Sequence, residues 1–182
     1  MPMLEQPTIT TERLVLRPFT VEDATLVEQL AGHPDVAATT LNIPHPYPSG
    51  GAIAWFATQA EDLRTGKAVV FAITLKSDNT LIGAMGLEIQ RKHDRAEMGY
   101  WIGKPYWNHG YATEAAKAVL DFGFKSLGLH RIHASHFAEN VASGRVMQKA
   151  RMHHEGTMRG RVKKSGRYID IVIYARLATD PS

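Results

Sequence analysis

Residues 96–115 read AEMGYWIGKPYWNHGYATEA, and this stretch decides how the rest of the chain is arranged. The residues up to Gly103 indicate a β-strand, Lys104-Pro105 interrupts it, and a helix is expected to begin at Gly110. A helix start leaves backbone N–H groups unpaired and carries the positive end of the helix dipole. Such a loop binds an anion such as a diphosphate, or it is an ordinary strand-to-helix turn whose glycine lets the backbone bend. The loop alone favours the two interpretations equally.

The composition is that of one globular domain. The chain has 182 residues, of which 44% are hydrophobic and 21% charged, which is enough to bury a sizeable core. We therefore expect a single domain over residues 1–182, with its core at about 11–177. The chain contains no cysteine, which excludes disulfides, thiolate metal sites and a cysteine nucleophile.

The sequence predicts neither a membrane nor a nucleic-acid partner. The N-terminus, MPMLEQPTITTER, has no signal-peptide pattern, and the longest apolar stretch, Ala68–Leu75, is too short to cross a bilayer. We expect a cytoplasmic protein. The net charge of +3 is a weak signal for nucleic acid, and the basic run from Arg159 to Arg167 is interpreted as a solvated hairpin tip.

Apolar spacing and turn residues divide the chain into strands and helices. Thr20 and Asp23 match a capping box at the first helix, and the proline-rich residues 34–51 are expected to be an irregular loop beside the substrate. The predicted helices run from Thr20 to Leu30, Ala52 to Leu63, Gly110 to about Leu127, and Asn140 to about Lys149. The predicted strands are Arg13–Phe19, Val69–Leu75, Thr80–Ile89, Ala96–Gly103, Arg131–Phe137, His153–Arg161 and Arg167–Leu177.

This order predicts an α+β fold, in which about four helices flank a mixed, mostly antiparallel sheet of six to seven strands. The strand–helix–strand unit from Ala96 to Phe137 predicts a right-handed parallel crossover, which puts the loop before Gly110 at the carboxyl end of a strand. Ligands favour that position. A dinucleotide-binding fold is disfavoured, because three antiparallel strands precede the loop and no Gly-x-Gly-x-x-Gly occurs there.

Several short motifs, taken together in this order, resemble the GNAT superfamily of acyl-CoA-dependent N-acyltransferases. Within it they are similar to the branch that contains the ribosomal-protein alanine N-acetyltransferases. The matching segments are Thr11–Pro18, Leu81–Gly83, Ala96–Trp101, Gly110–Ala115, His130-Arg131, Glu139–Ser143, Glu155-Gly156 and Gly166–Asp170.

The resemblance implies that acetyl-CoA is the acyl donor and lies where the fourth and fifth strands of the sheet splay apart. Asn140 is implied to hydrogen-bond the pantetheine arm, or to cap its own helix. The arm would also pair with the backbone of Trp101, Ile102 and Gly103. The pyrophosphate would rest on backbone amides of Asn108, His109, Gly110, Tyr111, Ala112 and Thr113.

Acetylation of an amine needs a group that removes a proton from the ammonium. The resemblance places Glu97 in that role, although the same residue could be a surface carboxylate on a strand. Glu114 is the poorer candidate, because a carboxylate in a first helical turn is commonly structural. Ser143 matches the position of the residue that protonates the leaving thiolate, or it is a polar residue in a first turn. An N–H of Trp101 or Ile102 would stabilise the negative charge on the thioester oxygen.

No metal site is predicted, because His133 and His136 are an odd number of residues apart on a strand and point to opposite faces. Three positions depart from the family pattern, and the first is Trp107, where many members have glutamine or arginine. Asn108 and Arg151 stand where glycine is usual, and Arg151 would be strained in the left-handed conformation that ends a helix.

The function predicted from the sequence is an acetyl-CoA-dependent N-acetyltransferase that transfers an acetyl group to a primary amine. The acceptor is a protein N-terminus or a small-molecule amine, bound between the loop from Thr39 to Gly51 and the final hairpin. The alternative is a non-catalytic acyl-CoA-binding or sensor module of the same fold. No nucleic-acid or membrane partner is expected, and the sequence is compatible with a homodimer.

Overall fold

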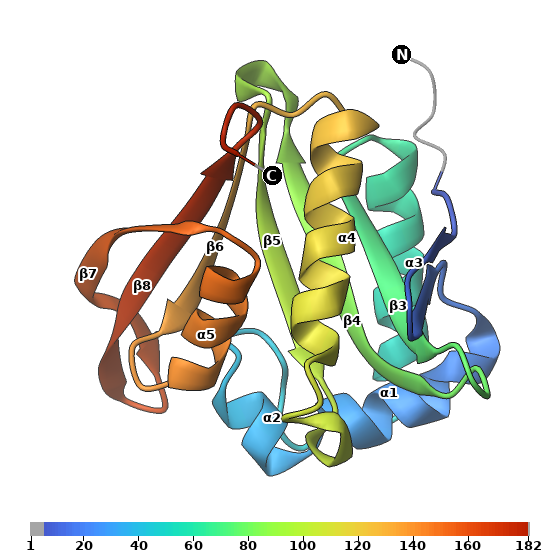
Figure 1. The fold of residues 1–182 in the computed structure, drawn as a ribbon. Helices are drawn as coiled ribbons and strands as arrows, with labels where there is room; N and C mark the ends of the chain where they lie inside the picture. The colour runs from blue at the N-terminus through green and yellow to red at the C-terminus, as the bar shows by residue number, and fades with distance from the viewer. Residues whose placement is uncertain (1–5, 182) are drawn as a thin grey trace.

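The computed structural model describes residues 6–181 and is built on one eight-stranded sheet (Figure 1). The strand order is β1-β2-β3-β4-β5-β6-β8-β7, and neighbours run antiparallel except β5 and β6, which are parallel. This confirms the predicted α+β class. The strands are β1 (Ile9–Thr10), β2 (Leu14–Arg17), β3 (Ala68–Leu75), β4 (Leu81–Gln90), β5 (Arg95–Ile102), β6 (Arg131–Phe137), β7 (His153–Lys164) and β8 (Arg167–Leu177).

Five α-helices lie within residues 6–181, one more than predicted. The additional one, α2, falls in the segment predicted as irregular. Pro34 begins it, since a proline in the first turn has a backbone already set for a helix. None of the described helices is long and apolar enough to cross a membrane. The helices are α1 (Ala24–Ala31), α2 (Pro34–Ala38), α3 (Gly51–Arg64), α4 (Tyr111–Lys125) and α5 (Val141–Lys149).

The capping box predicted before the first helix is present. The Asp23 carboxylate accepts the backbone N–H of Thr20 at 2.8 Å, although a short 3₁₀ turn, Val21–Asp23, precedes α1. Asp23 also binds both terminal nitrogens of the Arg17 guanidinium at 2.8 Å. The strand β2 and the start of α1 are therefore fixed to each other by a bidentate ion pair.

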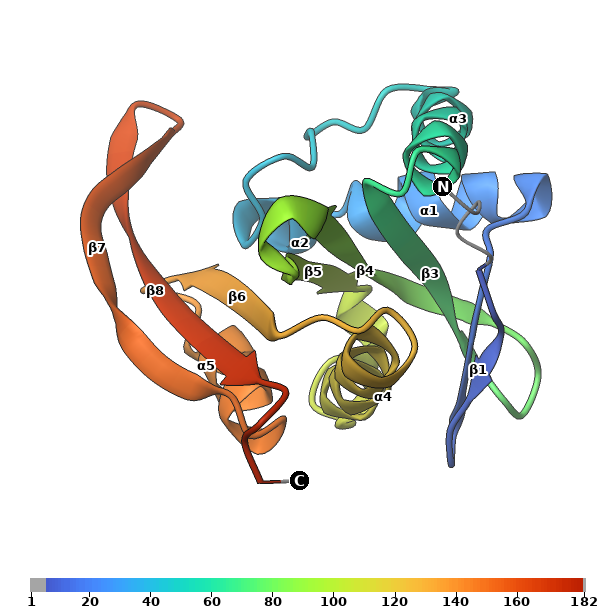
Figure 2. The same cartoon turned by 90° about the horizontal axis from the view of Figure 1, so that it is seen from above.

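Helices cover both faces of the sheet. Seen from above, α4 and α5 lie on one face, and α1, α2 and α3 lie on the other (Figure 2). Each face has its own core of buried side chains. One core includes Phe71, Leu87 and Leu120, and the other includes Val27 and Trp101. The sheet therefore separates two sides of the molecule, and a residue's place along β5 decides which side it faces.

The two edges of β5 differ in pairing. Its partner β4 follows it through eight residue pairs, from Gly83 with Ile102 to Gln90 with Arg95. Its partner β6 pairs with it only at Arg95, Ala96 and Glu97. Beyond Glu97 the two strands separate, as Figure 1 shows toward the lower part of the molecule. This is the predicted splay between the fourth and fifth strands of the predicted set.

Helix α5 ends with a residue in the left-handed conformation, which favours glycine, and that residue is Arg151. Arg151 has φ 60°, its N–H donates to Gln148 O at 2.9 Å, and the N–H of Met152 donates to Met147 O at 3.0 Å. This pair of bonds is a Schellman motif. The left-handed conformation costs a non-glycine residue about 1–2 kcal/mol, and the structure tolerates that strain here.

Candidate active site

The loop between β5 and α4 presents free backbone amides. Asn108 and Gly110 have positive φ of 64° and 80°, which explains why glycine is usual at position 108 as well. The first helical bond is from Glu114 N–H to Gly110 O, at 3.1 Å. Within residues 6–181, the N–H groups of residues 108–113 donate to no protein acceptor. This is the arrangement that an anion at a helix start requires.

Glu114 holds this loop in place. Its carboxylate accepts Thr11 Oγ1–H at 2.6 Å, Arg13 N–H at 2.8 Å and Arg13 Nε–H at 2.7 Å. Burial opposes the charged carboxylate, but the hydrogen bonds from Thr11 and Arg13 outweigh it and lower the pKa of Glu114. The Arg13 guanidinium also donates to His109 O at 2.9 Å. Glu114 is thus structural, and the segment before β2 fixes the loop.

The register of β5 decides which of its backbone groups face the gap. Gly103 N–H donates to Ile82 O at 2.8 Å, so the alternation of antiparallel pairs also turns the backbone of Trp101 toward β4. This corrects the prediction that Trp101 and Gly103 pair with the donor. Tyr100 and Ile102 face the gap instead, although Ile102 O already accepts Trp107 Nε1–H at 2.7 Å.

Tyr100 and Ser143 meet across the gap on the face covered by α4 and α5. The Tyr100 hydroxyl lies 2.6 Å from Ser143 Oγ, and burial raises the pKa of Tyr100 to about 12. Asn140 caps α5 by accepting the Ser143 N–H at 3.2 Å. Tyr100 was not among the site residues predicted from the sequence. Its odd separation from Glu97 on one strand was a signal that it faces the opposite side.

Glu97 lies on the other face, where the pairing of β5 and β6 ends. Its side chain is 47% exposed, accepts Ser135 Oγ–H at 3.2 Å, and lies 3.6 Å from His133 Nε2. Hydrogen bonding to His133 outweighs burial and, with Ser135, lowers the pKa of Glu97. The carboxylate therefore stays ionised near neutral pH.

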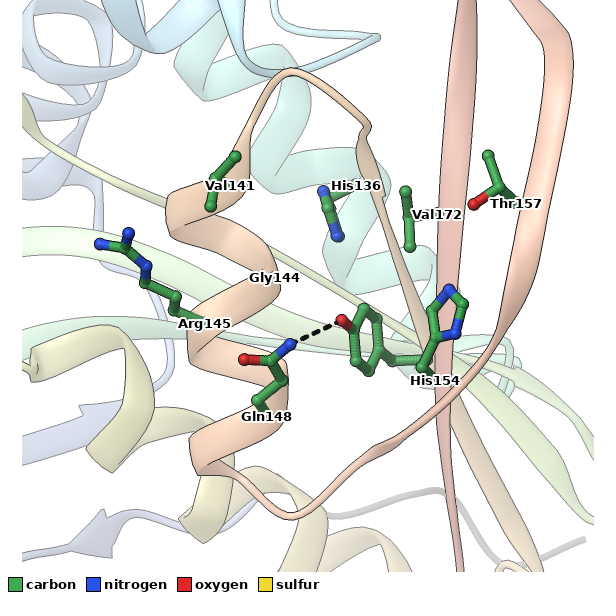
Figure 3. Close-up of a pocket in the computed structure, with 9 residues that line it drawn as sticks. His136, Val141, Gly144, Arg145, Gln148, His154, Thr157 and Val172 are labelled. Atoms are coloured by element: carbon green, nitrogen blue, oxygen red, sulfur yellow. Dashed lines mark hydrogen bonds between the residues drawn. The ribbon is translucent and has the colours of Figure 1, made fainter.

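A hollow of about 310 Å³ lies apart from these groups, between α5 and the strands β7 and β8 (Figure 3). His136, Gly144 and Gln148 line it, and Gln148 donates to the Tyr174 hydroxyl at 2.9 Å. None of the predicted site residues lines this hollow. His136 and His133 do point to opposite faces. No group of three or more metal-binding side chains occurs in the part of the chain that the structure describes.

The final hairpin contacts the loop predicted to form the acceptor side. Lys164 near its tip donates hydrogen bonds to the carbonyls of Ala37 and Thr40, and burial lowers the pKa of Lys164. The basic run is therefore not uniformly solvated, which corrects the interpretation from sequence. Trp55 and Phe56 pack against Phe19, with ring centroids 5.1 and 4.8 Å from that of Phe19.

A sheet that opens beside a helix start with free amides defines the class of acyl-CoA-dependent acetyltransferases, and comparison with known proteins agrees. Residues 13–153 match the family described as Acetyltransferase (GNAT) domain. The chain is 34% identical over 172 residues to the Uncharacterized N-acetyltransferase p20 of Bacillus licheniformis, covering 93% of this chain and 96% of that protein. The chain belongs to the GNAT family and is an acetyl-CoA-dependent N-acetyltransferase.

Solved structures share the fold. The GNAT acetyltransferase of Bacillus anthracis has a TM-score of 0.85 at 29% identity, covering 96% of this chain and all of that one. The ribosomal-protein-S5-alanine acetyltransferase of Vibrio fischeri has a TM-score of 0.84 at 19% identity, covering 96% and 98%. At that identity the likeness shows the fold alone, so the ribosomal-protein branch stays a prediction.

Proposed function

We propose that this enzyme acetylates a primary amine, either a protein N-terminus or a small-molecule amine, by direct attack of the amine on the thioester. One observation carries the proposal: the gap between β5 and β6 has Glu97 at its end on one face and the Tyr100–Ser143 pair on the other. A proton acceptor and a proton donor thus lie on opposite sides of the place where a thioester would sit.

The residues present fit acetyl-CoA. The free amides of Asn108, His109, Gly110, Tyr111, Ala112 and Thr113 suit a pyrophosphate, because several N–H groups and a helix dipole converge there. The open edge of β5 suits the amides of pantetheine, which would pair with Tyr100 and Ile102 as an added strand does. Asn140 accepts one bond through its side-chain oxygen, which leaves its amide nitrogen to serve the donor.

The chemistry follows from the two sides of the gap. Glu97 is ionised and half-exposed, so it would accept a proton from the ammonium and leave the amine lone pair free to attack. The N–H of Ile102 faces the gap and would stabilise negative charge on the thioester oxygen. Ser143, hydrogen-bonded to a tyrosine that keeps its proton, would protonate the leaving thiolate.

Release of free thiol from acetyl-CoA, measured against a panel of acceptors, tests this function. The panel contains a peptide with an N-terminal alanine, an L-amino acid, spermidine and an amino sugar. For the best acceptor, we expect Glu97→Gln to lower kcat by about 100-fold, the lower end for a general base, while acetyl-CoA affinity changes less than threefold.

Glu88→Gln is the matched control, because Glu88 pairs with Glu97 across β4 and β5 and is exposed. It should retain the kcat of the unmodified enzyme. An equal loss in both variants would show that local negative charge matters and that Glu97 is not the base. Binding of acetyl-CoA without turnover on any amine would favour the non-catalytic module.

A further inference from the structure

We propose that His133 is a positioning residue for Glu97, and that its imidazole takes up the proton that the carboxylate removes from the acceptor ammonium. The inference rests on the proposed role of Glu97 and extends it to a second residue. In this proposal Glu97 on β5 and His133 on β6 together accept the proton of the acceptor ammonium.

The two side chains meet where the pairing of β5 and β6 ends. Glu97 and His133 are the last residue pair of β5 and β6 before the strands separate, so they lie side by side on the same face. His133 Nε2 is 3.6 Å from Glu97 Oε2, a separation that a small rotation converts into a hydrogen bond. Catalytic hydrogen bonds are often long before substrate binds.

His133 has few contacts that a structural histidine would have. Its Nδ1 is buried and has no hydrogen-bond partner within the described chain; His136 likewise leaves Nε2 unpaired there, but its Nδ1 donates to Phe137 O at 2.7 Å. Buried side-chain nitrogens are nearly always paired, so an orphan one beside a proposed base calls for a functional explanation. A ring whose Nε2 carries a proton and donates it to Glu97 when the ring is charged, and is free to take one up when the ring is neutral, supplies one.

The charges around the ring suit a proton that arrives there. Glu97 faces it from β5, with Glu88 beside Glu97 on β4. Glu155 on β7 binds Arg131 at 2.6 Å, and both lie on the same side. The residues of β8 that pair nearby, Ala175 and Ile173, are uncharged. Glu97 and Glu155 thus act on the ring together with the Arg131 guanidinium, so a positive charge on the ring meets a net negative charge.

The proton balance is simple. An N–H bond of the ammonium breaks, its electron pair stays on nitrogen as the nucleophile, and the Glu97 carboxylate carries the proton to Nε2 of His133, where a new N–H bond forms. The ring releases this proton to solvent after the reaction. The pair is useful because the pKa of Glu97 is lowered, which makes the carboxylate alone a weak proton acceptor, and the imidazole beside it provides a second acceptor for the proton.

Two variants of His133 distinguish proton uptake by its imidazole from a hydrogen bond that only holds the Glu97 side chain. His133→Gln keeps an amide that can still donate to Glu97, and His133→Phe removes the polar contact. With the best acceptor of the panel, we expect His133→Gln to lower kcat at pH 7 about tenfold and to move the acid limb of the kcat/KM profile to lower pH, with the KM for acetyl-CoA unchanged. His154→Gln, an exposed histidine on β7, is the control and should keep the profile of the unmodified enzyme.

A second measurement does not depend on turnover. Titration of the Glu97 carboxyl by carbon-13 NMR, in the free enzyme, should give a higher pKa in His133→Phe than in the unmodified protein, because the contact that lowers it is lost. Thermal unfolding of each variant shows whether it is folded.

An unchanged Glu97 titration in a folded His133→Phe variant would overturn the pairing. A rate loss in His133→Gln without movement of the acid limb would reduce His133 to a structural role and overturn proton uptake. If the unmodified enzyme acetylates no amine while Glu97 and His133 are still coupled in the titration, the proposed function fails and this inference fails with it, whereas the pairing itself is established.

Discussion

The two edges of strand β5 belong to the same eight residues but differ in how fully they are paired. On the β4 side, eight residue pairs lock the strand, and Gly83 of β4 lies against the backbone of Trp101. On the β6 side only three pairs form, and the remaining backbone is open. An open edge normally invites aggregation. Here the Tyr100–Ser143 contact bridges it. The edge paired with β4 therefore holds β5 in place. Because β5 is held there, the backbone on its β6 side can stay unpaired and available to a ligand.

The largest expected effect comes from damaging the paired edge. A methyl group at Gly83 would lie 2.3 Å from Trp101 O, whereas one at Gly99 meets nothing within 4 Å. We expect Gly83→Ala to lower the free energy of unfolding by about 3 kcal/mol, as overpacking does. Gly99→Ala should change it by less than about 0.5 kcal/mol. Urea unfolding of both variants is the measurement, and equal losses would refute the asymmetry.

The next effect concerns the loop that follows the open edge. Glu114→Gln removes the charge from three hydrogen bonds and should cost about 2 kcal/mol of stability at pH 7, with weaker acetyl-CoA binding. Because the folded-state pKa of Glu114 is lowered, its stabilisation is present above the ordinary carboxyl pKa and is lost as the pH falls through the lowered value. The difference between variant and parent should therefore shrink in acid.

Asp121→Asn is the control for that measurement. Asp121 pairs with Lys125 at 2.8 Å on the exposed face of the same helix, where ion pairs contribute little. A loss as large as that of Glu114→Gln would mean that general helix charge is responsible and not the contact with Thr11 and Arg13.

The smallest expected effect is on kcat and concerns the Tyr100–Ser143 contact across the open edge of β5. Ser143→Ala should lower kcat about tenfold, less than the roughly 100-fold at the low end for a proton donor because the Tyr100 hydroxyl remains, and Tyr100→Phe only about threefold, since it leaves the serine in place. Because the pKa of Tyr100 is raised to about 12, its hydroxyl stays protonated, and the alkaline limb of the rate profile should be the same in Tyr100→Phe up to pH 10. Stopped assays across pH 6–10 decide this, and a complete loss in Tyr100→Phe would make the tyrosine the donor.

The long elements of the fold could be predicted from sequence, and the short ones could not. The strand Arg131–Phe137 was predicted to the residue, because its apolar alternation is bounded by clear turns. The strand Ile9–Thr10 and the helix Pro34–Ala38 have too few residues to show any periodicity. Their positions depend on packing against distant segments.

For the site, individual residues could be predicted but not their partners. Glu97, Ser143 and the loop amides were singled out by motif. The contacts of Glu97 with His133 depend on the register of β5 and β6, which is set by three residue pairs and leaves no local pattern. The contact of Lys164 with Thr40 joins residues 124 positions apart and depends on the path of the β7–β8 hairpin.

The empty space beside Gly99 offers a route to the acceptor. Gly99 is exposed and lies on the same face of β5 as Glu97, two residues further along the strand. Because the chain has no cysteine, Gly99→Cys would carry the sole thiol of the protein. Amine-bearing disulfide fragments could then be tethered there one at a time and identified by mass spectrometry, so that the enzyme selects its own acceptor chemistry from a library.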